Sequence, residues 1–452
     1  MTSTSTPQEE LEGVGTRIRE LLLRGDATGA GEAAGAMHAS DLADLLEELD
    51  EELRIPLLSA VPVELASGAL AEMEEGEDRG DLLSALTPAM RAEFLHELAD
   101  DDAADLIGDL EPPEQQRILD ALPAEEADDL IDLLKYDEDS AGGLMTTELV
   151  ALNATLTAGE AIEEVRIQGR EIEDFYTVFV VDSEKRLLGT LRLDDLVIAD
   201  PGSLVGELVE APIATVLPDV DQEEVGRLIS RYNLVAIPVV TEDDVLLGRI
   251  TFDDVIDVIE AEQTEDILRL AGLNDEDDLR HSWQQAVRAR LPWLSLNLMT
   301  AALAASVILV YEDVIDQVIT LAFLAPIIAA MGGSSGTQSL AITIRRITVE
   351  GSGRTRGHVM REILIGLVNG AVLGIGIAVL ALLVDGDPRL GLVVLLAMWG
   401  NQIVAGFAGA FVPATLDRMG IDPSIASSVF VHTLTDLCGF FLLLGLASRL
   451  LL

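Results

Sequence analysis

One acidic side chain interrupts an apolar run near the end of the 452-residue chain. The run extends from about residue 425 to 447, and Asp436 lies near its middle, in the stretch VFVHTLTDLCGF. A carboxylate at the centre of a bilayer costs about 2.5 to 3.5 kcal/mol on insertion scales, so it is rare there without a polar cavity or partner. His432 and Thr433 precede it by four and three residues and therefore share its face of a helix. This pattern predicts a polar site inside a membrane.

A single aspartate per chain supplies too little charge to strip the water from a small divalent ion, which dehydrates reluctantly. A twofold axis would double that charge, and two Asp436 carboxylates could then hold a hydrated ion through its waters. The competing interpretation is a protonated Asp436 that hydrogen-bonds to a neighbouring helix. Asn401, Gln402 and Asn369, in the two preceding apolar stretches, are candidates to face the same interior.

Another apolar stretch, LAPIIAAMGGSSGTQSLAITI, contains a second set of polar groups. It includes Pro326 and a cluster of small and polar residues at 332–339, with Gly332, Gly333 and Ser334 among them. Backbone groups freed by such residues are tolerated at membrane depth where they line a water-filled route. We therefore predict an interrupted helix along a pathway, with close helix packing through the glycines as the alternative.

Five apolar stretches can hold these groups in a bilayer, because each has about 18 or more residues. They cover residues 293–311, 314–344, 363–384, 390–416 and 425–447. With the amino terminus inside, nine arginines flank the cytoplasmic ends and two flank the outer ends. This asymmetry predicts cytoplasmic N-terminal domains and a C-terminus outside. The start, MTSTSTPQEE, has no basic stretch before an apolar core, so we expect no cleaved signal peptide.

The region before the membrane half begins with short amphipathic helices. After a disordered tail at 1–10, we predict a helical solenoid at 11–137. The stretch SDLADLLEELDEELRIPLLSAVP (40–62) aligns without gaps on DDAADLIGDLEPPEQQRILDALP (101–123). Apolar positions three and four apart bury one stripe per helix, which predicts stacked helix pairs. Its carboxylates, including Asp102 and Asp105, suit solvated helix faces.

A sharper repeat follows. FYTVFVVDSEKRLLGTLRLDDLV (175–197) aligns without gaps on LVAIPVVTEDDVLLGRITFDDVI (234–256). Each copy has a β-rich run, an acidic turn, a second short strand entered through a glycine, and a helix that opens with paired aspartates, which predicts two α/β units. The pattern resembles a tandem CBS-domain pair, with CBS 1 at 138–203 and CBS 2 at 204–258.

In many CBS domains a Thr or Ser followed three residues later by Asp holds an adenine nucleotide. The second copy has Thr251 and Asp254 at these positions, whereas the first copy has Arg192 in place of the threonine. The resemblance thus allows one ATP site. A helix cap made by the same two residues needs no ligand.

An acidic connecting helix is predicted between the α/β units and the membrane half, within residues 259–290. The stretch VIDVIEAEQTEDILRLAGL projects four carboxylates from one apolar rod. They belong to Glu260, Glu262, Glu265 and Asp266.

The chain is strongly acidic, with 80 Asp and Glu against 28 Lys and Arg and a formal net charge of -52. Such a field repels phosphate backbones, which argues against nucleic-acid binding and favours divalent cations as counter-ions. An acid-rich surface with few lysines is also typical of halophilic proteins, and this accounts for most of the charge. Cys438 is the single cysteine, so an intrachain disulfide and a cysteine zinc cluster are both excluded.

The order of helical solenoid, CBS pair, acidic helix and five spans resembles the MgtE family of magnesium channels and transporters. The stretches that carry the resemblance are YDEDSAGGLMTTE, IEAEQTEDI, PIIAAMGGSSGTQSLAITIR and GIDPSIASSVFVHTLTDLCGF. It implies a multidomain fold: an all-α superhelical N domain, an α/β tandem CBS pair, a connecting (plug) helix, and an α-helical five-span membrane domain at 291–452.

The resemblance implies a homodimer in the plasma membrane that conducts Mg²⁺ down its gradient. Asp436 matches the family's pore aspartate, with Thr433, His432, Gly332, Gly333 and Ser334 as its companions. Cytoplasmic Mg²⁺ bound between acidic surfaces would close the pore. The candidate sensor ligands are Asp253, Asp257, Glu260, Glu262, Glu265, Asp266, Asp102 and Asp105; those at the membrane ends are Asp422, Glu312 and Asp316.

Two positions depart from the family pattern. Ser334 and Gly406 stand where asparagine is common, and both changes remove a contact to the ion's water shell. A broader divalent cation transporter, for Co²⁺ or Mn²⁺, is therefore an alternative. A membrane-anchored CBS sensor of nucleotide or cation, without transport, is the rival hypothesis, but it leaves Asp436 unexplained. No nucleophile elbow or phosphate-binding glycine loop followed by lysine appears, so we expect no enzyme.

Overall fold

The computed structural model describes residues 7–73, 77–170, 172, 175–271, 273, 283–350, 355–419, 421–424 and 427–452. These residues form two compact units, Met1–Ile259 and Glu260–Leu452. The first helix begins at Pro7, so residues 7–10, predicted to belong to a disordered tail, are helical. Residues 1–6 of that predicted tail lie outside the described residues.

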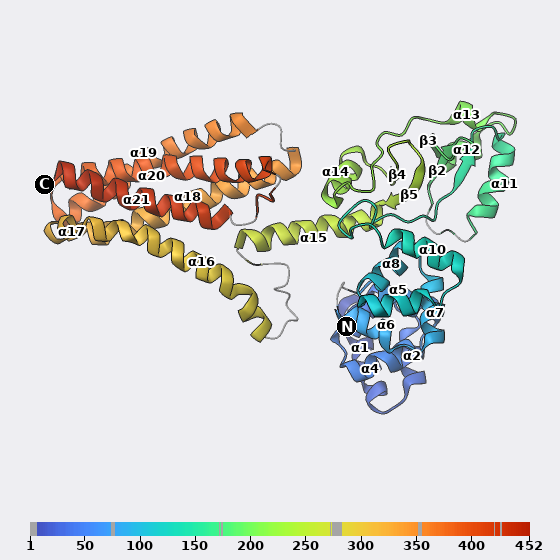
Figure 1. The fold of residues 1–452 in the computed structure, drawn as a ribbon. Helices are drawn as coiled ribbons and strands as arrows, with labels where there is room; N and C mark the ends of the chain where they lie inside the picture. The colour runs from blue at the N-terminus through green and yellow to red at the C-terminus, as the bar shows by residue number, and fades with distance from the viewer. Residues whose placement is uncertain are drawn as a thin grey trace, which may run out of the picture. The chain divides into compact units, whose positions relative to one another are not determined.

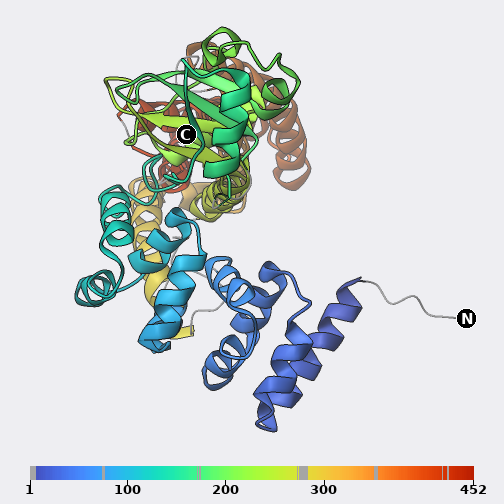
Figure 2. The same ribbon diagram turned by 90° about the vertical axis from the view of Figure 1, so that its right-hand side faces the viewer.

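The N-terminal part of the first unit is a stack of short helices (Figure 2). They are α1 (Pro7–Leu23), α2 (Ala27–Ala34), α3 (Ala39–Glu48), α4 (Glu51–Leu58), α5 (Val63–Ala71), α6 (Glu77–Ala85), α7 (Pro88–Glu97), α8 (Asp100–Gly108), α9 (Pro112–Leu119) and α10 (Ala124–Leu133). The two aligned sequence copies form the pairs α3–α4 and α8–α9. Their leucines, such as Leu46 and Leu106, are fully buried in one continuous core. The predicted solenoid of helix pairs is confirmed.

A side chain in several of these helices caps the C-terminal carbonyls of the helix before it. The same five-residue spacing recurs, with Arg54 donating to the carbonyl of Leu49 at 3.0 Å, Arg91 to that of Leu86 at 3.2 Å and Gln115 to that of Leu110 at 2.9 Å. Helix ends leave carbonyls without an intrahelical donor, and these side chains supply one. The pair α6–α7 therefore uses the same device as the two copies that the sequence alignment detected.

Each α/β unit of the CBS pair is built around an antiparallel strand pair. The first contains β1 (Ala151–Asn153), α11 (Ala158–Gln168), β2 (Thr177–Val181), β3 (Leu187–Arg192), α12 (Leu193–Ile198) and α13 (Val205–Leu208); the second contains α14 (Gln222–Tyr232), β4 (Ala236–Val240), β5 (Leu246–Thr251) and α15 (Phe252–Ala271). Strand β1 runs parallel to β2, and β2 is antiparallel to β3, giving the order β1-β2-β3. Pairing of Val180 with Gly189 corresponds to pairing of Val239 with Gly248, so the two copies share one register.

The glycines in these strands leave room for another segment of backbone. A Cβ on Gly189 would lie 2.2 Å from the carbonyl oxygen of Glu210, and one on Gly248 would lie 2.6 Å from that of Thr146. Both distances are far below a van der Waals contact, so a larger residue would displace the crossing chain.

Within the described residues of the second unit, five helices are long and apolar enough to cross a membrane. The helices are α16 (Trp283–Val310), α17 (Glu312–Gln317), α18 (Thr320–Glu350), α19 (Thr355–Asp385), α20 (Pro388–Arg418) and α21 (Ser427–Leu450), of which the short α17 is not a span. Helices α18 to α21 pack side by side (Figure 1). Their shared core includes Leu321, Val394 and Leu443, all fully buried. The five predicted spans are confirmed.

Helix α18 is continuous through its glycine-rich stretch, so the predicted interruption is wrong. The small residues instead allow neighbouring helices to approach. A Cβ on Gly336 would lie 2.6 Å from Cγ1 of Val431 on α21, and one on Gly409 of α20 would lie 2.6 Å from the carbonyl oxygen of Gly336. Close packing through glycines, the alternative considered above, is what this face of α18 provides.

Candidate functional site

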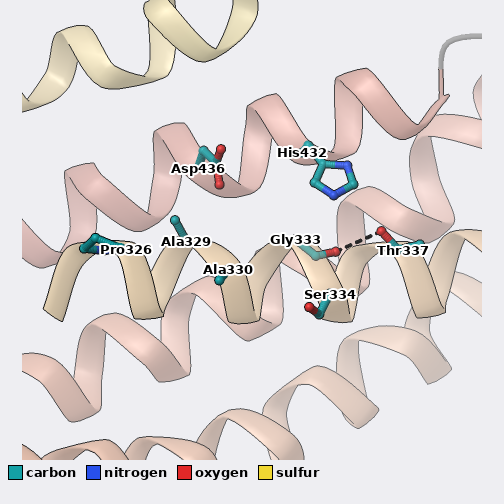
Figure 3. Close-up of a pocket in the computed structure, with 8 residues that line it drawn as sticks. All are labelled: Pro326, Ala329, Ala330, Gly333, Ser334, Thr337, His432 and Asp436. Carbon is teal, nitrogen blue, oxygen red and sulfur yellow. Dashed lines mark hydrogen bonds between the residues drawn. The ribbon is translucent and has the colours of Figure 1, made fainter. Parts of the chain in front are cut away.

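An open groove of about 590 Å³ lies between α18 and α21 (Figure 3). Helix α21 contributes His432 and Asp436 to it. Helix α18 contributes a single face, because its lining residues recur at intervals of three and four. They are Pro326, Ala329, Ala330, Gly333, Ser334 and Thr337. The groove therefore has one carboxylate, one imidazole and two hydroxyls on an otherwise apolar wall.

The imidazole of His432 points from α21 toward Gly333 of α18 (Figure 3). A Cβ on Gly333 would lie 3.0 Å from its Cδ2, so a larger residue would push the ring away from α18. The ring nitrogen Nδ1 lies 2.8 Å from the carbonyl oxygen of Ser428 and must donate to it, since a carbonyl only accepts. In the neutral ring, Nε2 is then an acceptor. It joins the Asp436 carboxylate, one turn away, as a group that can accept hydrogen bonds from the waters of a hydrated cation.

The structure brings together four of the six residues predicted around the pathway: Asp436, His432, Gly333 and Ser334. The other two face elsewhere. The hydroxyl of Thr433 donates to the carbonyl of Val429 in its own helix, at 2.7 Å. Gly332 packs against Asn401, whose Nδ2 would lie 2.3 Å from an added Cβ.

The sequence analysis assigned no role to the alanines at 329 and 330, treated Pro326 only as a helix breaker, and included Thr337 only as part of the pathway-lining cluster at 332–339. Their spacing from Gly333 and Ser334 was the available signal, because residues three and four apart share one helix face. Thr337 donates to the carbonyl of Gly333 at 3.1 Å, which leaves its oxygen free to accept from a ligand in the groove.

The carboxamides predicted to face the same interior behave differently from one another. Asn369 is exposed on the outer surface of α19. Asn401 and Gln402 are fully buried and donate to main-chain carbonyls of α18, Asn401 to that of Ile328 at 3.0 Å and Gln402 to that of Met331 at 2.9 Å. They lie behind the groove, not in it.

A second polar site lies within the unit Glu260–Leu452, where the last part of α15 meets the end of α18 and the segment before α21. Arg269 forms an ion pair with Glu265 one turn away and another with Asp422, which precedes α21. Burial, followed by the charges of Asp422 and Glu262, raises the pKa of Asp266 to about 6. Two of the predicted carboxylates, Glu265 and Asp422, thus pair with one guanidinium, and Asp266 lies near Asp422 and Glu262.

The remaining predicted ligands on α15 and α17 are solvent exposed. They are Asp253, Asp257 and Glu260 on α15 and Glu312 and Asp316 on α17. Among the residues that the structure describes, no three His, Cys, Asp or Glu side chains are arranged to hold a metal ion directly.

A third polar site joins the solenoid to the second α/β unit. Asp100, at the start of α8, accepts hydrogen bonds from the Thr146 hydroxyl at 2.5 Å and from the amide of Thr147 at 3.1 Å. Burial and the charges of Asp102 and Asp254 raise the pKa of Asp101 well above its usual range. Its Oδ1 is buried and has no hydrogen-bond partner within the described part of the chain.

Asp102 and Asp254 belong to this site together, although they lie far apart in the sequence. Desolvation, followed by the charges of Asp254 and Glu72, raises the pKa of Asp102 to about 6, although its side chain is solvent exposed. Asp105, one turn further along α8, is half-buried. The Thr251 amide donates to Asp254 at 3.2 Å, and the Thr251 hydroxyl donates to the same carboxylate. These two residues form the helix cap that was the alternative to a nucleotide site.

Comparison with known proteins gives matches along most of the chain. A family model described as a divalent cation transporter, MgtE, matches residues 325–446; the MgtE intracellular N domain matches 37–139; and CBS domains match 141–202 and 205–261. The magnesium transporter MgtE of Enterococcus faecalis is 36% identical over 416 residues, which cover 91% of this chain and 92% of that protein. The chain belongs to the MgtE family.

Other MgtE proteins extend the match to nearly the full length. The magnesium transporter MgtE of Thermus thermophilus is 35% identical over 447 residues, covering 97% of this chain and 99% of that protein. The crystal structure of the cytosolic domain of the Mg²⁺ channel MgtE in complex with ATP is 36% identical with a TM-score of 0.52, and covers 54% of this chain and 99% of that one. The family and the multidomain fold inferred from the sequence are confirmed. Five apolar helices and this membership make the chain a multi-pass membrane protein.

Proposed function

We propose that this MgtE protein is a magnesium channel that acts as a homodimer in the plasma membrane. Its N-terminal domains face the cytoplasm, its C-terminus lies outside, and Mg²⁺ enters passively. Three relatives named as magnesium transporters, at 32% to 36% identity, support the substrate. Helix α16 is compatible with the dimer, because only 6% of its most apolar segment is buried within the chain, which leaves its surface for lipid or a second copy.

The observation that carries this function is the polar groove between α18 and α21. A carboxylate in a membrane span is costly unless it serves a pathway or a partner. Asp436 borders open space in company with His432 and the hydroxyl of Ser334. Two copies of the chain would present two such carboxylates, enough to balance the charge of one hydrated Mg²⁺.

Gating by cytoplasmic Mg²⁺ follows from the carboxylates on α15. The contact of Arg269 with Asp422 ties this helix to the start of α21. Divalent cations bound among Glu262, Glu265, Asp266 and Asp422 would link α15 to the start of α21 more strongly than the guanidinium does and hold the channel closed. Asp102 with Asp254, the exposed Asp253, Asp257 and Glu260, and the half-buried Asp105 would add binding in the cytoplasmic domains. Magnesium would then favour the closed state by binding it more tightly than the open one.

Flux in liposomes tests the pathway. The wild-type protein should carry Mg²⁺, and Asp436→Asn should lower the flux at least about tenfold, a loss equivalent to about 1.4 kcal/mol. Thr433→Val on the same helix is the matched control, because the Thr433 hydroxyl bonds within α21. An unchanged flux in Asp436→Asn would remove this aspartate from the pathway.

The same assay separates the alternatives. Flux of Co²⁺ and Mn²⁺ equal to that of Mg²⁺ would favour a broader divalent cation transporter. If no ion moves at any Mg²⁺ or nucleotide concentration, the chain acts as a membrane-anchored sensor instead.

ATP is the second ligand that we propose, at Thr251 and Asp254 of CBS 2. The related cytosolic domain solved in complex with ATP supports it. Binding here requires the nucleotide to replace the bond between Thr251 and Asp254. Calorimetry with ATP should show one site per chain, and Asp254→Ala should abolish it. Heat unchanged by that substitution would place ATP elsewhere.

A further inference from the structure

Two consecutive carboxamides on α20 reach the same neighbouring helix. Asn401 and Gln402 are both 0% exposed, and each donates to a different main-chain carbonyl of α18. Those carbonyls belong to Ile328 and Met331, which flank Ala329 and Ala330 in the wall of the groove. The two amides therefore hold α18 on the side away from the groove, at the level where α18 faces Asp436.

Asn401 also contacts α21. Its carboxamide lies between Gly332 of α18 and Gly439 of α21, where an added Cβ would lie 2.3 Å and 2.9 Å from Nδ2 respectively. Gly439 is three residues from Asp436 and so lies within one helical turn of it. One side chain thus connects the carbonyl at Ile328 with the segment of α21 that carries the groove carboxylate.

The oxygens of these amides carry a cost that the donated hydrogen bonds do not remove. Their oxygens, Oδ1 of Asn401 and Oε1 of Gln402, are buried and have no hydrogen-bond partner among the residues that the structure describes. A buried oxygen without a partner carries the full desolvation cost of that group. Leucine at 401 and methionine at 402 would fill similar volumes without that cost. Exchanging the amide oxygen and nitrogen would not help, because an oxygen would then face the carbonyl of α18.

We propose that Asn401 and Gln402 are positioning residues that fix the distance between α18 and Asp436 and thereby set the selectivity among divalent cations. This inference rests on the proposed transport of Mg²⁺. Selection between hydrated ions of similar size requires acceptors held to within about 0.5 Å. A wall that carries only small side chains, such as Ala329 and Gly333, can supply that rigidity only through its backbone, and the two amides hold that backbone.

The test uses isosteric apolar variants of the full chain, Asn401→Leu and Gln402→Met, in liposomes. Uptake of Mg²⁺ and of Co²⁺ is measured for each ion alone, and thermal unfolding is followed in detergent. We expect each variant to retain its unfolding transition and its Mg²⁺ uptake, while the ratio of Mg²⁺ to Co²⁺ uptake falls about tenfold, equivalent to about 1.4 kcal/mol. Thr415→Val is the control, because the Thr415 hydroxyl on α20 donates only to the carbonyl of Phe411 in its own helix.

Three results would overturn the inference. The first is an unchanged ratio in both variants. The second is loss of the unfolding transition, which would make the amides necessary for folding itself. The third is a wild-type protein that does not distinguish the two ions. If the wild-type protein carries no divalent cation at all, the proposed function fails, and this inference fails with it.

Discussion

Arg269 on α15 forms an ion pair with Asp422, at the entrance to α21, and a second one with Glu265 on its own helix. A guanidinium can thus occupy the centre of a carboxylate cluster that divalent cations are proposed to bind. It neutralises part of the charge that would otherwise repel α15 from the membrane unit.

Replacing this guanidinium should loosen α15 in the absence of metal. Partly exposed ion pairs contribute about 0.2 to 1 kcal/mol, so Arg269→Gln should speed hydrogen exchange of the last turn of α15 by a factor of about 1.4 to 5 in EDTA. Added Mg²⁺ should restore protection, because the freed carboxylates still attract it. Arg389→Gln is the control, because Arg389 is an exposed arginine in the first turn of α20. Equal exchange in Arg269→Gln and wild type would show that the pair contributes nothing.

Gly332 should tolerate no side chain while Asn401 is present. Because an added Cβ would lie 2.3 Å from Nδ2 of Asn401, Gly332→Ala should destabilise the protein by about 1 to 3 kcal/mol, as overpacking of cores does. Thermal unfolding in detergent measures this. In an Asn401→Ala background the same glycine substitution should cost much less, since the clashing amide is gone. Equal costs in both backgrounds would contradict the packing role and leave a direct role for Gly332 in the pathway.

The acidic cluster at the start of α8 should make the metal-free protein more stable at lower pH. The pKa of Asp102 is raised to about 6, and that of Asp101 is raised as well, whereas unfolded carboxyls titrate near about 4. The folded state therefore binds more protons between these values, so stability rises as the pH falls from 7 to 5. The charged groups around the two aspartates are Asp100, Asp254, Glu72 and Arg79.

Thermal unfolding in EDTA at several pH values checks the direction in which stability changes with pH. Asp101→Asn and Asp102→Asn should flatten the rise. Glu97→Gln, exposed on α7, should keep it. A melting temperature of the wild-type protein that decreases as the pH is lowered from 7 to 5 would contradict the prediction.

The caps of the solenoid should contribute to its stability in proportion to their burial. Arg54 is only 8% exposed and donates to the carbonyls of Leu49 and Glu47. Because hydrogen bonds from charged groups contribute about 1.5 to 3 kcal/mol, Arg54→Met should lower the unfolding midpoint clearly. Arg117 also donates to a carbonyl, that of Pro113, but at the surface, so Arg117→Met should change little. Similar effects of the two substitutions would show that burial is not the cause.

Much of the fold could be predicted because its signals are periodic or long. Five apolar stretches, two aligned helix pairs and two aligned α/β units each correspond to an element of the structure. The groove could be predicted in part, since a carboxylate in an apolar helix needs a polar surrounding. Asp436 and His432 both border it.

Contacts between distant segments could not be predicted in the same way. Asp102 lies 152 positions before Asp254, and Arg269 lies 153 positions before Asp422, and no local pattern pairs them. The interruption predicted in α18 failed for a related reason. Small residues free the backbone only if no other helix covers them, and Val431 and Gly409 cover Gly336 closely.

Because α18 is continuous, the number of residues between two positions decides whether they lie on the same face of the helix. Ala330, Gly333 and Thr337 face the groove, while Gly332 and Gly336 face the other helices. One residue turns a helix by about 100°, so deleting a single alanine between Pro326 and Gly332 would rotate every later side chain by that amount relative to the start of the helix. The hydroxyl-bearing side chains would then lie where Gly332 and Gly336 now allow close helix contacts. The length of this segment is therefore as constrained as its composition.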